Sequence, residues 1–466
     1  MEELLNIVSR TNSCLSDYVL ITLLVGAGIY FTARTRFVQV RCFAEGFRKA
    51  FGNFSLHGKN SQKGLSSCQA LATAVAAQVG TGNIVGASGA ILVGGPGAIF
   101  WMWIIAFFGM ATIYAEAVLA QNTRIQTADG TFHGGPVYYI KKAFPDAFGK
   151  FLAVFFAIAI IISLGFMGCM VQANSIGETC QNAFNVPTWL VGLVLAALAT
   201  FIFIGGISRI ASVTEKIVPL MAVIYILGGL VILTLRIEYL PQTFGLIFKY
   251  AFAPDALIGG SFGYALKAAI SQGVKRGLFS NEAGMGSTPH AHAAAHVEKP
   301  HDQGVVAMVG VFVDTAIVLT MTALIVISTL YTGNGVLAKA NGANYAELLA
   351  SSGLTKTNLV QHAIASVSSE NVGNIFVAVC LLFFAFSTII SWNYFGKINF
   401  EYLFGRKAVI IYSALGVISI FCGTLMKNDL VWELQDMFNQ LMVLPNILAL
   451  IALSGIVAAA ARANKE

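Results

Sequence analysis

The charge-free stretch at residues 68–94 contains the feature that decides the fold. It reads CQALATAVAAQVGTGNIVGASGAILVG, an apolar helix interrupted at Gln78-Val79-Gly80-Thr81-Gly82-Asn83. Each glycine in a helix interior costs about 1 kcal/mol relative to alanine. Clustered glycines can serve close helix packing, but bare backbone deep in a membrane is also tolerated where it lines a cavity. We favour the second interpretation, a broken helix that lines a cavity.

The composition of the chain requires a membrane around this helix. Of the 466 residues, 57% are hydrophobic and 11% are charged, whereas an average soluble protein is about 25% charged. Residues 64–115 hold no Asp, Glu, Lys or Arg for 52 residues, and residues 371–396 hold none for 26. A membrane-spanning helix needs roughly 20 apolar residues. A soluble enzyme, a nucleic-acid binder and a secreted disulfide scaffold are therefore excluded.

Hydropathy predicts an all-α membrane protein with eleven apolar segments, joined mostly by short connections. The segments are 17–33, 68–94, 97–121, 149–177, 187–205, 212–235, 258–297, 303–330, 371–396, 407–426 and 437–461. The stretch 34–54 mixes phenylalanines with basic residues, which is typical of an amphipathic segment at the cytoplasmic headgroups. With the N-terminus outside, the cytoplasmic side holds 19 Lys and Arg residues and the outer side holds 6. This bias predicts a multi-pass protein of the cell membrane with a cytoplasmic C-terminus.

A second interruption predicts how the segments are organised. Segment 258–297 contains Gly277-Leu278-Phe279-Ser280-Asn281-Glu282-Ala283-Gly284-Met285-Gly286. Two blocks of five segments each open with an interrupted helix, which indicates inverted repeats with a site at the membrane midplane. We therefore predict a first repeat at 68–235 and a second at 258–466. Residues 1–67 form an extra N-terminal helix and the amphipathic segment.

Several motifs resemble those of the alanine or glycine:cation symporter family. They are Gln78–Gly86, Gly94–Trp103, Gly134-Gly135-Pro136 with Tyr138-Tyr139, and Phe279–Ser287. The resemblance covers nearly the whole chain and implies a LeuT-like fold in a bacterial or archaeal inner membrane. It implies co-transport of alanine or glycine with sodium, sometimes with protons, while some relatives are assigned to glutamine or asparagine. Ile113 stands where many members carry lysine, and Gln78 stands where a smaller residue is expected.

The predicted substrate site lies where the two interruptions meet. A helix N-terminus carries roughly +0.5 charge and free N–H groups, which suit the carboxylate of an amino acid. Glycine lets the backbone approach a ligand closely, Gln172 can satisfy both ends of a zwitterion, and two aromatic rings can wall the pocket. The candidate substrate-binding residues are Gly80, Thr81, Gly82, Asn83, Gln172, Phe279, Asn281 and Trp392.

The predicted cation site uses uncharged oxygens. The broken helix frees backbone carbonyls, and the resemblance implies hydroxyl ligands from segment 371–396. The candidate sodium ligands are the carbonyls of Ala76 and Val79, the side-chain oxygen of Asn83, and the hydroxyls of Ser387 and Thr388. The competing interpretations are an interhelical hydrogen bond for Asn83 and hydroxyls that bond back to their own helix.

Charged residues inside the segments also need a role. Glu282 lies at the second interruption and Arg276 lies six residues earlier. These two can pair as a gate or pair to hold the broken helix together, and we favour the structural pairing. A carboxylate at mid-membrane costs about 2.5–3.5 kcal/mol, and Asp314 is expected at a shallower depth. Glu116 is expected at the cytoplasmic end of its helix.

Metal-binding and catalytic patterns are missing from the sequence. The seven cysteines include no CxxC pair. Among His290, His292 and His296, the last two have the i, i+4 spacing that places both rings on one helix face, but no third-ligand pattern accompanies them. We expect the histidines to form a polar patch near the cytoplasmic end of segment 258–297. With no convincing set of a nucleophile and a base, the protein is predicted not to be an enzyme.

The sequence therefore predicts a secondary symporter in the lipid bilayer. It imports a small neutral amino acid, alanine or glycine, with sodium as the co-transported ion and no other cofactor. Two variants of this function stay open, a glutamine or asparagine substrate and coupling to protons. An ion channel is the alternative of a different class, because glycine-rich membrane segments also build selectivity filters. Two breaks at corresponding positions of one chain favour alternating access.

Overall fold

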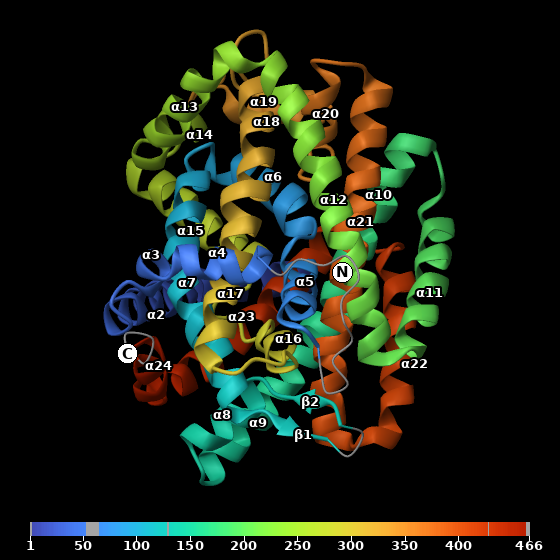
Figure 1. Ribbon diagram of the computed structural model, residues 1–466. Coiled ribbons are helices and arrows are strands. Elements are labelled where there is room, and N and C mark those ends of the chain that lie inside the picture. The colour runs from blue at the N-terminus through green and yellow to red at the C-terminus, as the bar shows by residue number, and fades with distance from the viewer. Residues whose placement is uncertain (1, 53–64, 128–129, 427, 463–466) are drawn as a thin grey trace.

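The computed structural model describes residues 2–52, 65–127, 130–426 and 428–462 as a bundle of helices (Figure 1). Within these residues, the strands are β1 (Ile125–Gln126) and β2 (Phe132–His133), which form a short antiparallel hairpin. The prediction of an all-α membrane part is confirmed. The hairpin lies in the 122–148 connection, where no strand was expected.

The helical elements follow one another along the chain, with η marking π-type or 3-10 segments. They are α1 (Glu2–Cys14), η1 (Leu15–Leu20), α2 (Ile21–Arg34), α3 (Val38–Arg41), α4 (Phe43–Phe51), α5 (Ser67–Gln78), η2 (Gly82–Gly86), α6 (Ala87–Gly94), α7 (Ala98–Thr123), α8 (Pro136–Ala143), α9 (Ala147–Ile160), η3 (Ile161–Gly168), α10 (Cys169–Phe184), α11 (Thr188–Ile204), α12 (Gly206–Leu235), η4 (Ile237–Tyr239), α13 (Leu240–Phe252), α14 (Asp255–Ile258), α15 (Phe262–Asn281), α16 (Pro289–Ala293), α17 (Pro300–Val311), η5 (Phe312–Leu319), α18 (Thr320–Leu330), α19 (Tyr345–Ser352), α20 (Leu359–Ala365), α21 (Glu370–Phe404), η6 (Arg406–Ala408), α22 (Val409–Gly423), α23 (Asn428–Ala452) and α24 (Ser454–Arg462).

Helices long enough to cross a membrane account for most of the predicted segments. In the described part of the chain, seven helices are long and apolar enough, and two bent pairs raise this number to nine. The pairs are Ser67–Gln78 with Gly82–Gly94, bent by 44°, and Val431–Ala452 with Ser454–Arg462, bent by 60°. The two remaining predicted segments correspond to α11, which is short, and to α15, which carries three basic residues.

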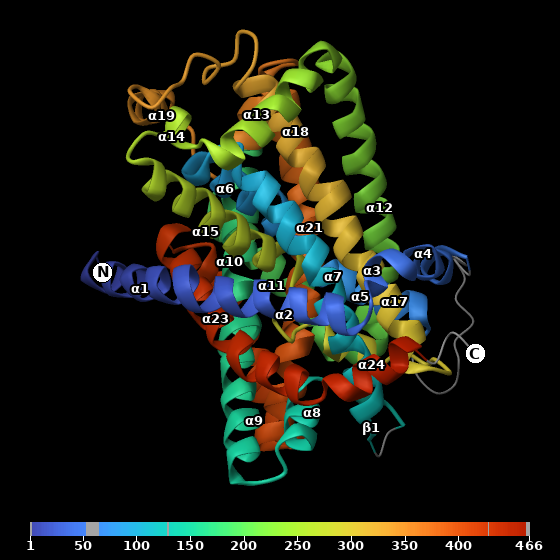
Figure 2. The same cartoon turned by 90° about the vertical axis from the view of Figure 1, so that its left-hand side faces the viewer.

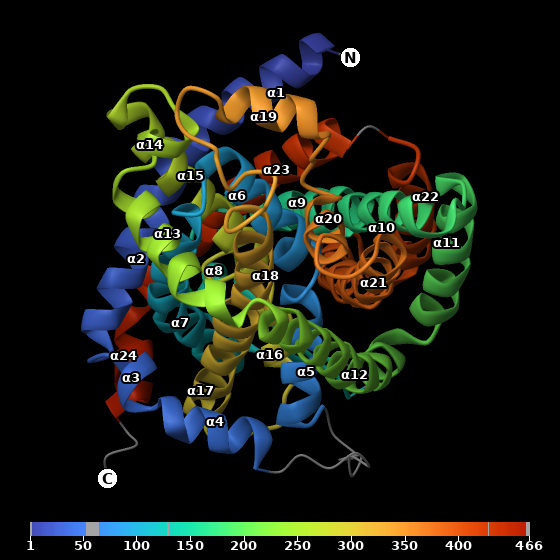
Figure 3. The same cartoon turned by 90° about the horizontal axis from the view of Figure 1, so that it is seen from above.

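The N-terminal part lies at the side of the bundle. Helix α1, η1 and α2 form one helical run that passes beside α7 and α23 (Figures 2 and 3). The predicted segment 17–33 is therefore part of a longer helix. After it, α4 packs against α17. Gly46 permits this contact, because a Cβ atom there would lie 2.4 Å from the carbonyl oxygen of Val305.

Besides η1, three π-type segments interrupt spanning helices. They are η2 in the first broken helix, η3 between α9 and α10, and η5 between α17 and α18. Such wider turns occur frequently at functional sites, because they displace backbone groups from the regular helical ladder. Segments η2 and η5 carry Asn83 and Asp314 of the candidate site described below, and Gly168 of η3 lies against the Trp392 ring.

Two predicted connections contain further helices. Residues 236–257 form η4, α13 and α14, and residues 331–370 contain α19 and α20. Together they cover one end of the bundle, at the top of Figure 1, while α8 and the hairpin lie at the opposite end. The ends of the bundle are therefore distinguishable by their cover.

Candidate functional site

The first break leaves a short stretch of backbone outside any helix. Helix α5 ends at Gln78, Val79 has an extended backbone (φ −82°, ψ 91°), and helical structure resumes at Gly82. The Gly80 N–H donates to Asn83 Oδ1 at 2.9 Å. Asn83 thus satisfies a donor that the break exposes, as side chains do at helix N-termini.

The second break is a loop of unusual backbone conformations. Helix α15 ends at Asn281, Glu282 has a positive φ of 58°, and Gly284 and Gly286 have φ values of 89° and 83°. A non-glycine residue in this left-handed region is uncommon. Glu116 of α7 accepts hydrogen bonds from the N–H groups of Gly284 (3.1 Å) and Gly286 (2.9 Å). The loop backbone is therefore held by a carboxylate from another helix.

The two breaks face each other in the middle of the bundle. A Cβ atom at Gly82 would lie 2.9 Å from the Cα atom of Ser280 and 3.1 Å from the Phe279 ring. Gln78 Nε2 donates to the Asn281 carbonyl at 2.8 Å. The absence of a side chain at Gly82 is therefore what lets the two chains approach.

The predicted sodium ligands of α5 and α21 lie together. Thr388 Oγ1 lies 2.9 Å from the Ala76 carbonyl and 3.4 Å from the Val79 carbonyl, and Ser387 Oγ lies 3.4 Å from the Ala76 carbonyl. Both hydroxyls also contact the carbonyl of Phe384 within their own helix, at 2.9–3.1 Å. The back-bonded arrangement and the contact between helices therefore coexist, and all of these oxygens are buried.

Asn83 belongs to a second group of oxygens, around a carboxylate that sequence reasoning placed too shallow. Asn83 Nδ2 donates to Asp314 Oδ1 at 2.6 Å. The hydroxyls of Ser280 (2.9 and 3.0 Å) and Thr315 (2.8 Å) also donate to the Asp314 carboxylate. Asp314 is fully buried, in η5, and pairs with no Lys or Arg of the described residues. The sequence did contain a signal for this group, because a carboxylate within a spanning helix is by default a candidate functional residue.

Asn83 itself makes the interhelical bond that competed with a ligand role. Its oxygen accepts from the Gly80 N–H and its nitrogen donates to Asp314. An amide oxygen has two lone pairs, so one lone pair remains after the bond to Gly80.

Gln172 lies against the first break and carries an unsatisfied donor. Its Oε1 atom accepts from the Thr81 N–H at 3.1 Å, while its Nε2 atom is buried and has no partner. The hydroxyl of Thr81 and the Nδ2 atom of Asn281 are also buried without a partner. Buried polar groups are normally hydrogen-bonded. These three unsatisfied donors on residues at or beside the breaks therefore indicate a polar ligand.

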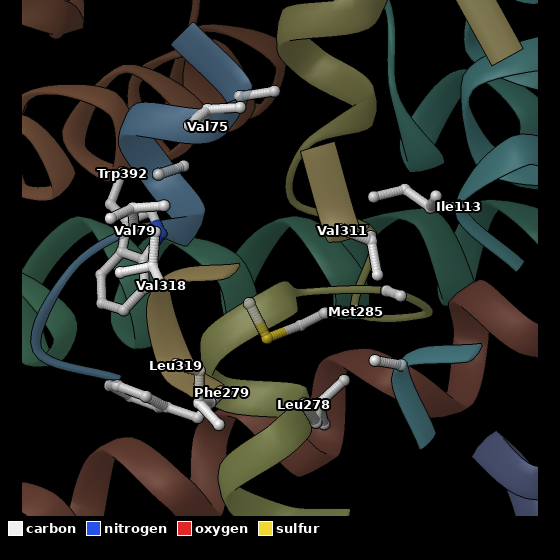
Figure 4. Close-up of a cluster of buried hydrophobic side chains, with 14 of the residues drawn as sticks. Val75, Val79, Ile113, Leu278, Phe279, Met285, Val311, Val318, Leu319 and Trp392 are labelled. Atoms are coloured by element: carbon white, nitrogen blue, oxygen red, sulfur yellow. The ribbon is translucent and has the colours of Figure 1, made fainter. Parts of the chain in front are cut away.

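Aromatic and aliphatic side chains surround these polar groups. The rings of Phe279 and Trp392 lie edge to face with centroids 5.6 Å apart, and Trp432 lies on another side of Phe279 at 4.8 Å. Figure 4 shows part of the apolar surround, with Val75 on α5 and Val79 at its end. A dry apolar surround strengthens every electrostatic contact inside it.

Comparison with known proteins shows the family to which this chain belongs. The profile of the sodium:alanine symporter family matches residues 1–466. The chain belongs to the sodium:alanine symporter family. It is therefore a multi-pass membrane protein of a family of sodium-coupled amino-acid symporters.

Relatives that are similar in sequence to this chain are named for different substrates and ions. The Sodium/alanine symporter AgcS of Methanococcus maripaludis is 40% identical over 467 residues, which cover 100% of this chain and 98% of the relative. The Putative sodium/proton-dependent alanine carrier protein YrbD of Bacillus subtilis is 41% identical, over 96% of this chain and 90% of the relative. The Probable sodium/glutamine symporter GlnT of Bacillus subtilis is 38% identical, over 98% and 90%.

Solved structures establish the LeuT-like fold. MhsT in complex with L-phenylalanine superposes with a TM-score of 0.57 at 15% identity, over 86% of this chain and 98% of that chain. The manganese transporter of Eremococcus coleocola superposes with a TM-score of 0.51 at 13% identity, over 86% and 81%. At these identities, the likeness concerns the fold alone.

The charged residues beside the site of this symporter pair differently from the prediction. Arg276 does not pair with Glu282. Its guanidinium lies 3.1 Å from Asp436 of α23, and Lys275 lies 2.8 Å from the same carboxylate. Hydropathy and residue spacing could not identify Asp436 as the partner of Arg276, because it lies 160 residues away on another helix, α23. Arg276 also stacks on the Trp432 ring at 4.8 Å.

A cavity of about 470 Å³ adjoins this ion pair. Its lining includes Arg276 and Lys356, together with residues of α6 and the 331–370 connection. Lys356 pairs with Asp429 at 3.0 Å and lies over the Trp432 ring at 5.2 Å. Burial lowers the pKa of Lys356 below its ordinary value. Charged side chains therefore line this cavity, and two of them, Arg276 and Lys356, lie against the Trp432 ring beside the site.

Two further expectations about polar residues are wrong. Glu116 is fully buried and caps the loop of the second break instead of ending its helix at the membrane surface. His290 and His292 are buried in separate contacts, with Asn399 at 2.8 Å and Gln303 at 2.8 Å, so they form no surface patch.

One group of residues has the composition of a metal site but forms an ion-pair network. In the described part of the chain, Cys42, Glu45 and His301 bring ligand atoms within 4.8 Å of one another. Glu45 accepts from Lys49 at 2.7 Å, and the His301 ring bonds to Tyr114 at 2.7 Å. The His301 ring also lies 3.5 Å from the Glu45 carboxylate, so the network joins α4 to α17 and α17 to α7. The pKa of Lys49 is raised above its ordinary value by hydrogen bonds to Asp302 and Glu45, against the effect of burial.

Proposed function

We propose that the protein imports a small neutral amino acid, alanine or glycine, together with sodium by alternating access. The observation that carries this proposal is the meeting of two bare backbone breaks beside uncharged oxygens. The printed names of AgcS and YrbD, which refer to alanine, support the same substrate class. Not one Lys or Arg of the described residues touches the central polar groups, so the substrate is a zwitterion that the site recognises through dipoles.

The carboxylate of the substrate binds at the first break. The helical run from Gly82 to Gly94 directs its positive end toward the break. Gln172 Nε2 and the Thr81 hydroxyl, both without partners, donate to the carboxylate. Asn281 Nδ2, which is also without a partner, is a further donor for the carboxylate. The ammonium group of the ligand binds backbone carbonyl groups near the second break.

Sodium binds among four oxygens, the backbone carbonyls of Ala76 and Val79 and the hydroxyls of Ser387 and Thr388. Sodium is a hard cation, and neutral carbonyl and hydroxyl oxygens replace its hydration shell. The Asp314 carboxylate with Asn83, Ser280 and Thr315 forms a second cation position, for sodium or a proton, because a buried carboxylate needs a compensating charge. The name of YrbD, which refers to both sodium and protons, supports either ion at this position.

Substrate size is limited by the aromatic walls. Trp392 and Phe279 leave room for a hydrogen atom or a methyl group beside Gly80-Thr81-Gly82. The second candidate substrate is glutamine, because GlnT is named as a glutamine symporter and Gln78 places an amide at the site.

Orientation and repeats complete the proposal. The N-terminus lies outside and the C-terminus lies in the cytoplasm, as the 19 to 6 bias of Lys and Arg supports. Residues 68–235 and 258–466 are inverted repeats, each opening with its broken helix, and residues 1–67 lie outside them. The Arg276–Asp436 pair then belongs to the outer closure of the site and must separate when the site opens outward.

Uptake of labelled alanine into proteoliposomes tests this function. A tenfold inward sodium gradient supplies about 1.4 kcal/mol, and 100 mV adds about 2.3 kcal/mol per charge. Their sum of about 3.7 kcal/mol sustains roughly several-hundredfold accumulation with one sodium per neutral substrate. Uptake that ignores sodium but follows a proton gradient overturns the sodium assignment. If glutamine displaces alanine as well as glycine does, the small-pocket assignment fails.

A further inference from the structure

Glu282 is a buried carboxylate to which the transport scheme assigns no role. It is fully buried and has a backbone φ of 58°. Arg276, the expected partner, pairs with Asp436 instead. Within the described residues, the two carboxylate oxygens accept from neutral donors, Trp392 Nε1 at 2.5 Å and the hydroxyl of Ser287. The described contacts of this carboxyl group, whose burial is costly, therefore include the indole of Trp392, which it holds by its N–H group.

The indole ring is confined on its other sides as well. A Cβ atom at Gly168 would lie 2.5 Å from Trp392 Cε3 and 2.6 Å from Cζ3, so the ring lies directly on the backbone of η3. The Phe279 ring approaches edge to face at 89°. Packing therefore restricts the ring from two sides, while the hydrogen bond to Glu282 fixes its N–H edge.

We propose that Glu282 is the positioning residue that sets the upper size limit of the substrate by holding Trp392 as a pocket wall. This inference rests on the proposed transport of a neutral amino acid. An indole N–H is a donor only, and a buried donor that loses its acceptor is destabilised. Without the bond, the indole turns and larger side chains enter the space that it occupied.

Four single variants separate this role from general stability. Glu282→Ala removes the acceptor, Glu282→Gln keeps an acceptor oxygen, and Trp392→Phe keeps a ring but removes the N–H group. The matched control is Trp103→Phe, because Trp103 also donates an indole N–H bond, to Thr320 Oγ1 at 2.9 Å, but does not belong to the site. The measured quantity is the ratio of the leucine and alanine concentrations that halve the uptake of labelled alanine.

We expect this ratio to fall by about tenfold or more in Glu282→Ala and in Trp392→Phe, within the 10–200-fold that pocket shape controls. Glu282→Gln restores most of the wild-type ratio, and Trp103→Phe retains it. The double variant Glu282→Ala with Trp392→Phe shows no larger change than either single variant. A wild-type ratio in Glu282→Ala, or effects that multiply in the double variant, overturns the proposal.

Gly168→Ala provides the opposite test and does not alter Glu282. The added methyl group pushes the indole toward the ligand, so glycine should gain over alanine. Unchanged preference contradicts the confinement of the ring. In a variant whose other four tryptophans are phenylalanine, Glu282→Ala should shift the Trp392 fluorescence spectrum and Glu282→Gln should not. The same spectrum in all three overturns the hydrogen bond without any transport assay.

The inference and the proposed function fail separately. Wild-type protein that takes up no neutral amino acid with sodium refutes the function, while the fluorescence test still decides whether Glu282 holds Trp392. Wild-type transport with unaltered size selectivity in the variants refutes the positioning role alone.

Discussion

Gly80→Ala should weaken the coupling to sodium through one methyl group. Gly80 does not have a positive φ, so alanine itself fits the backbone. Its Cβ atom would lie 2.4 Å from Thr388 Oγ1 and 3.1 Å from Gln172 Oε1. Threonine is stiff at χ1 because its Cβ is branched. The hydroxyl must therefore leave its position 2.9 Å from the Ala76 carbonyl, which removes one sodium ligand.

The size of this effect follows from the cost of overpacking. Extra methyl groups in a packed interior cost about 1–3 kcal/mol, and each 1.4 kcal/mol corresponds to about tenfold in an equilibrium constant. We expect the sodium concentration for half-maximal alanine uptake to rise roughly 5- to 150-fold. The assay measures alanine uptake into proteoliposomes as a function of external sodium at saturating alanine.

Gly86→Ala is the matched control in the same broken helix. A Cβ atom at Gly86 would meet only the Thr81 carbonyl at 3.8 Å and Arg276 Cδ at 4.0 Å, which are ordinary contacts. This variant should retain the wild-type sodium dependence. Addition of Thr388→Ser to Gly80→Ala should recover part of the loss, because the serine hydroxyl turns more freely. If Gly80→Ala and Gly86→Ala have equal sodium dependence, the assignment of the ion to this group is refuted.

Three further variants test neighbouring contacts. Thr388→Ala should raise the sodium requirement without changing the preference between alanine and glycine, and an unchanged sodium curve would remove α21 from the ion site. Asp314→Asn weakens hydrogen bonds to a charged group worth about 1.5–3 kcal/mol, so we expect alanine-evoked currents on supported membranes to need roughly 10- to 150-fold more cation. Currents with wild-type cation dependence would exclude a second cation position. Asp436→Asn leaves Lys275 and Arg276 buried without their carboxylate, and breaking a buried pair costs about 3–5 kcal/mol. Thermal unfolding in detergent should therefore occur at lower temperature, and an unchanged midpoint would show that the pair adds no stability.

The sequence by itself predicted the positions of nine spans, which the structure contains as seven long helices and two bent pairs, and the positions of both breaks. These features are local. Hydropathy depends on the composition of about 20 neighbouring residues, and a glycine destabilises the helix in which it lies. The breaks at Gly80–Gly82 and Glu282–Gly286 are where the glycines indicated. The resemblance of motifs supplied the partner helix for the Ala76 carbonyl, and the structure brings Thr388 to it.

Only the tertiary structure decided which charged groups meet. Asp314 lies 231 residues from Asn83, and Arg276 lies 160 residues from Asp436, yet each pair is in hydrogen-bond contact. Arg276 and Glu282 are six residues apart and do not pair. The physical reason is that a polar contact depends on how far each helix is rotated and how deep it lies. Packing of whole helices sets both quantities, and neither hydropathy nor residue spacing records them.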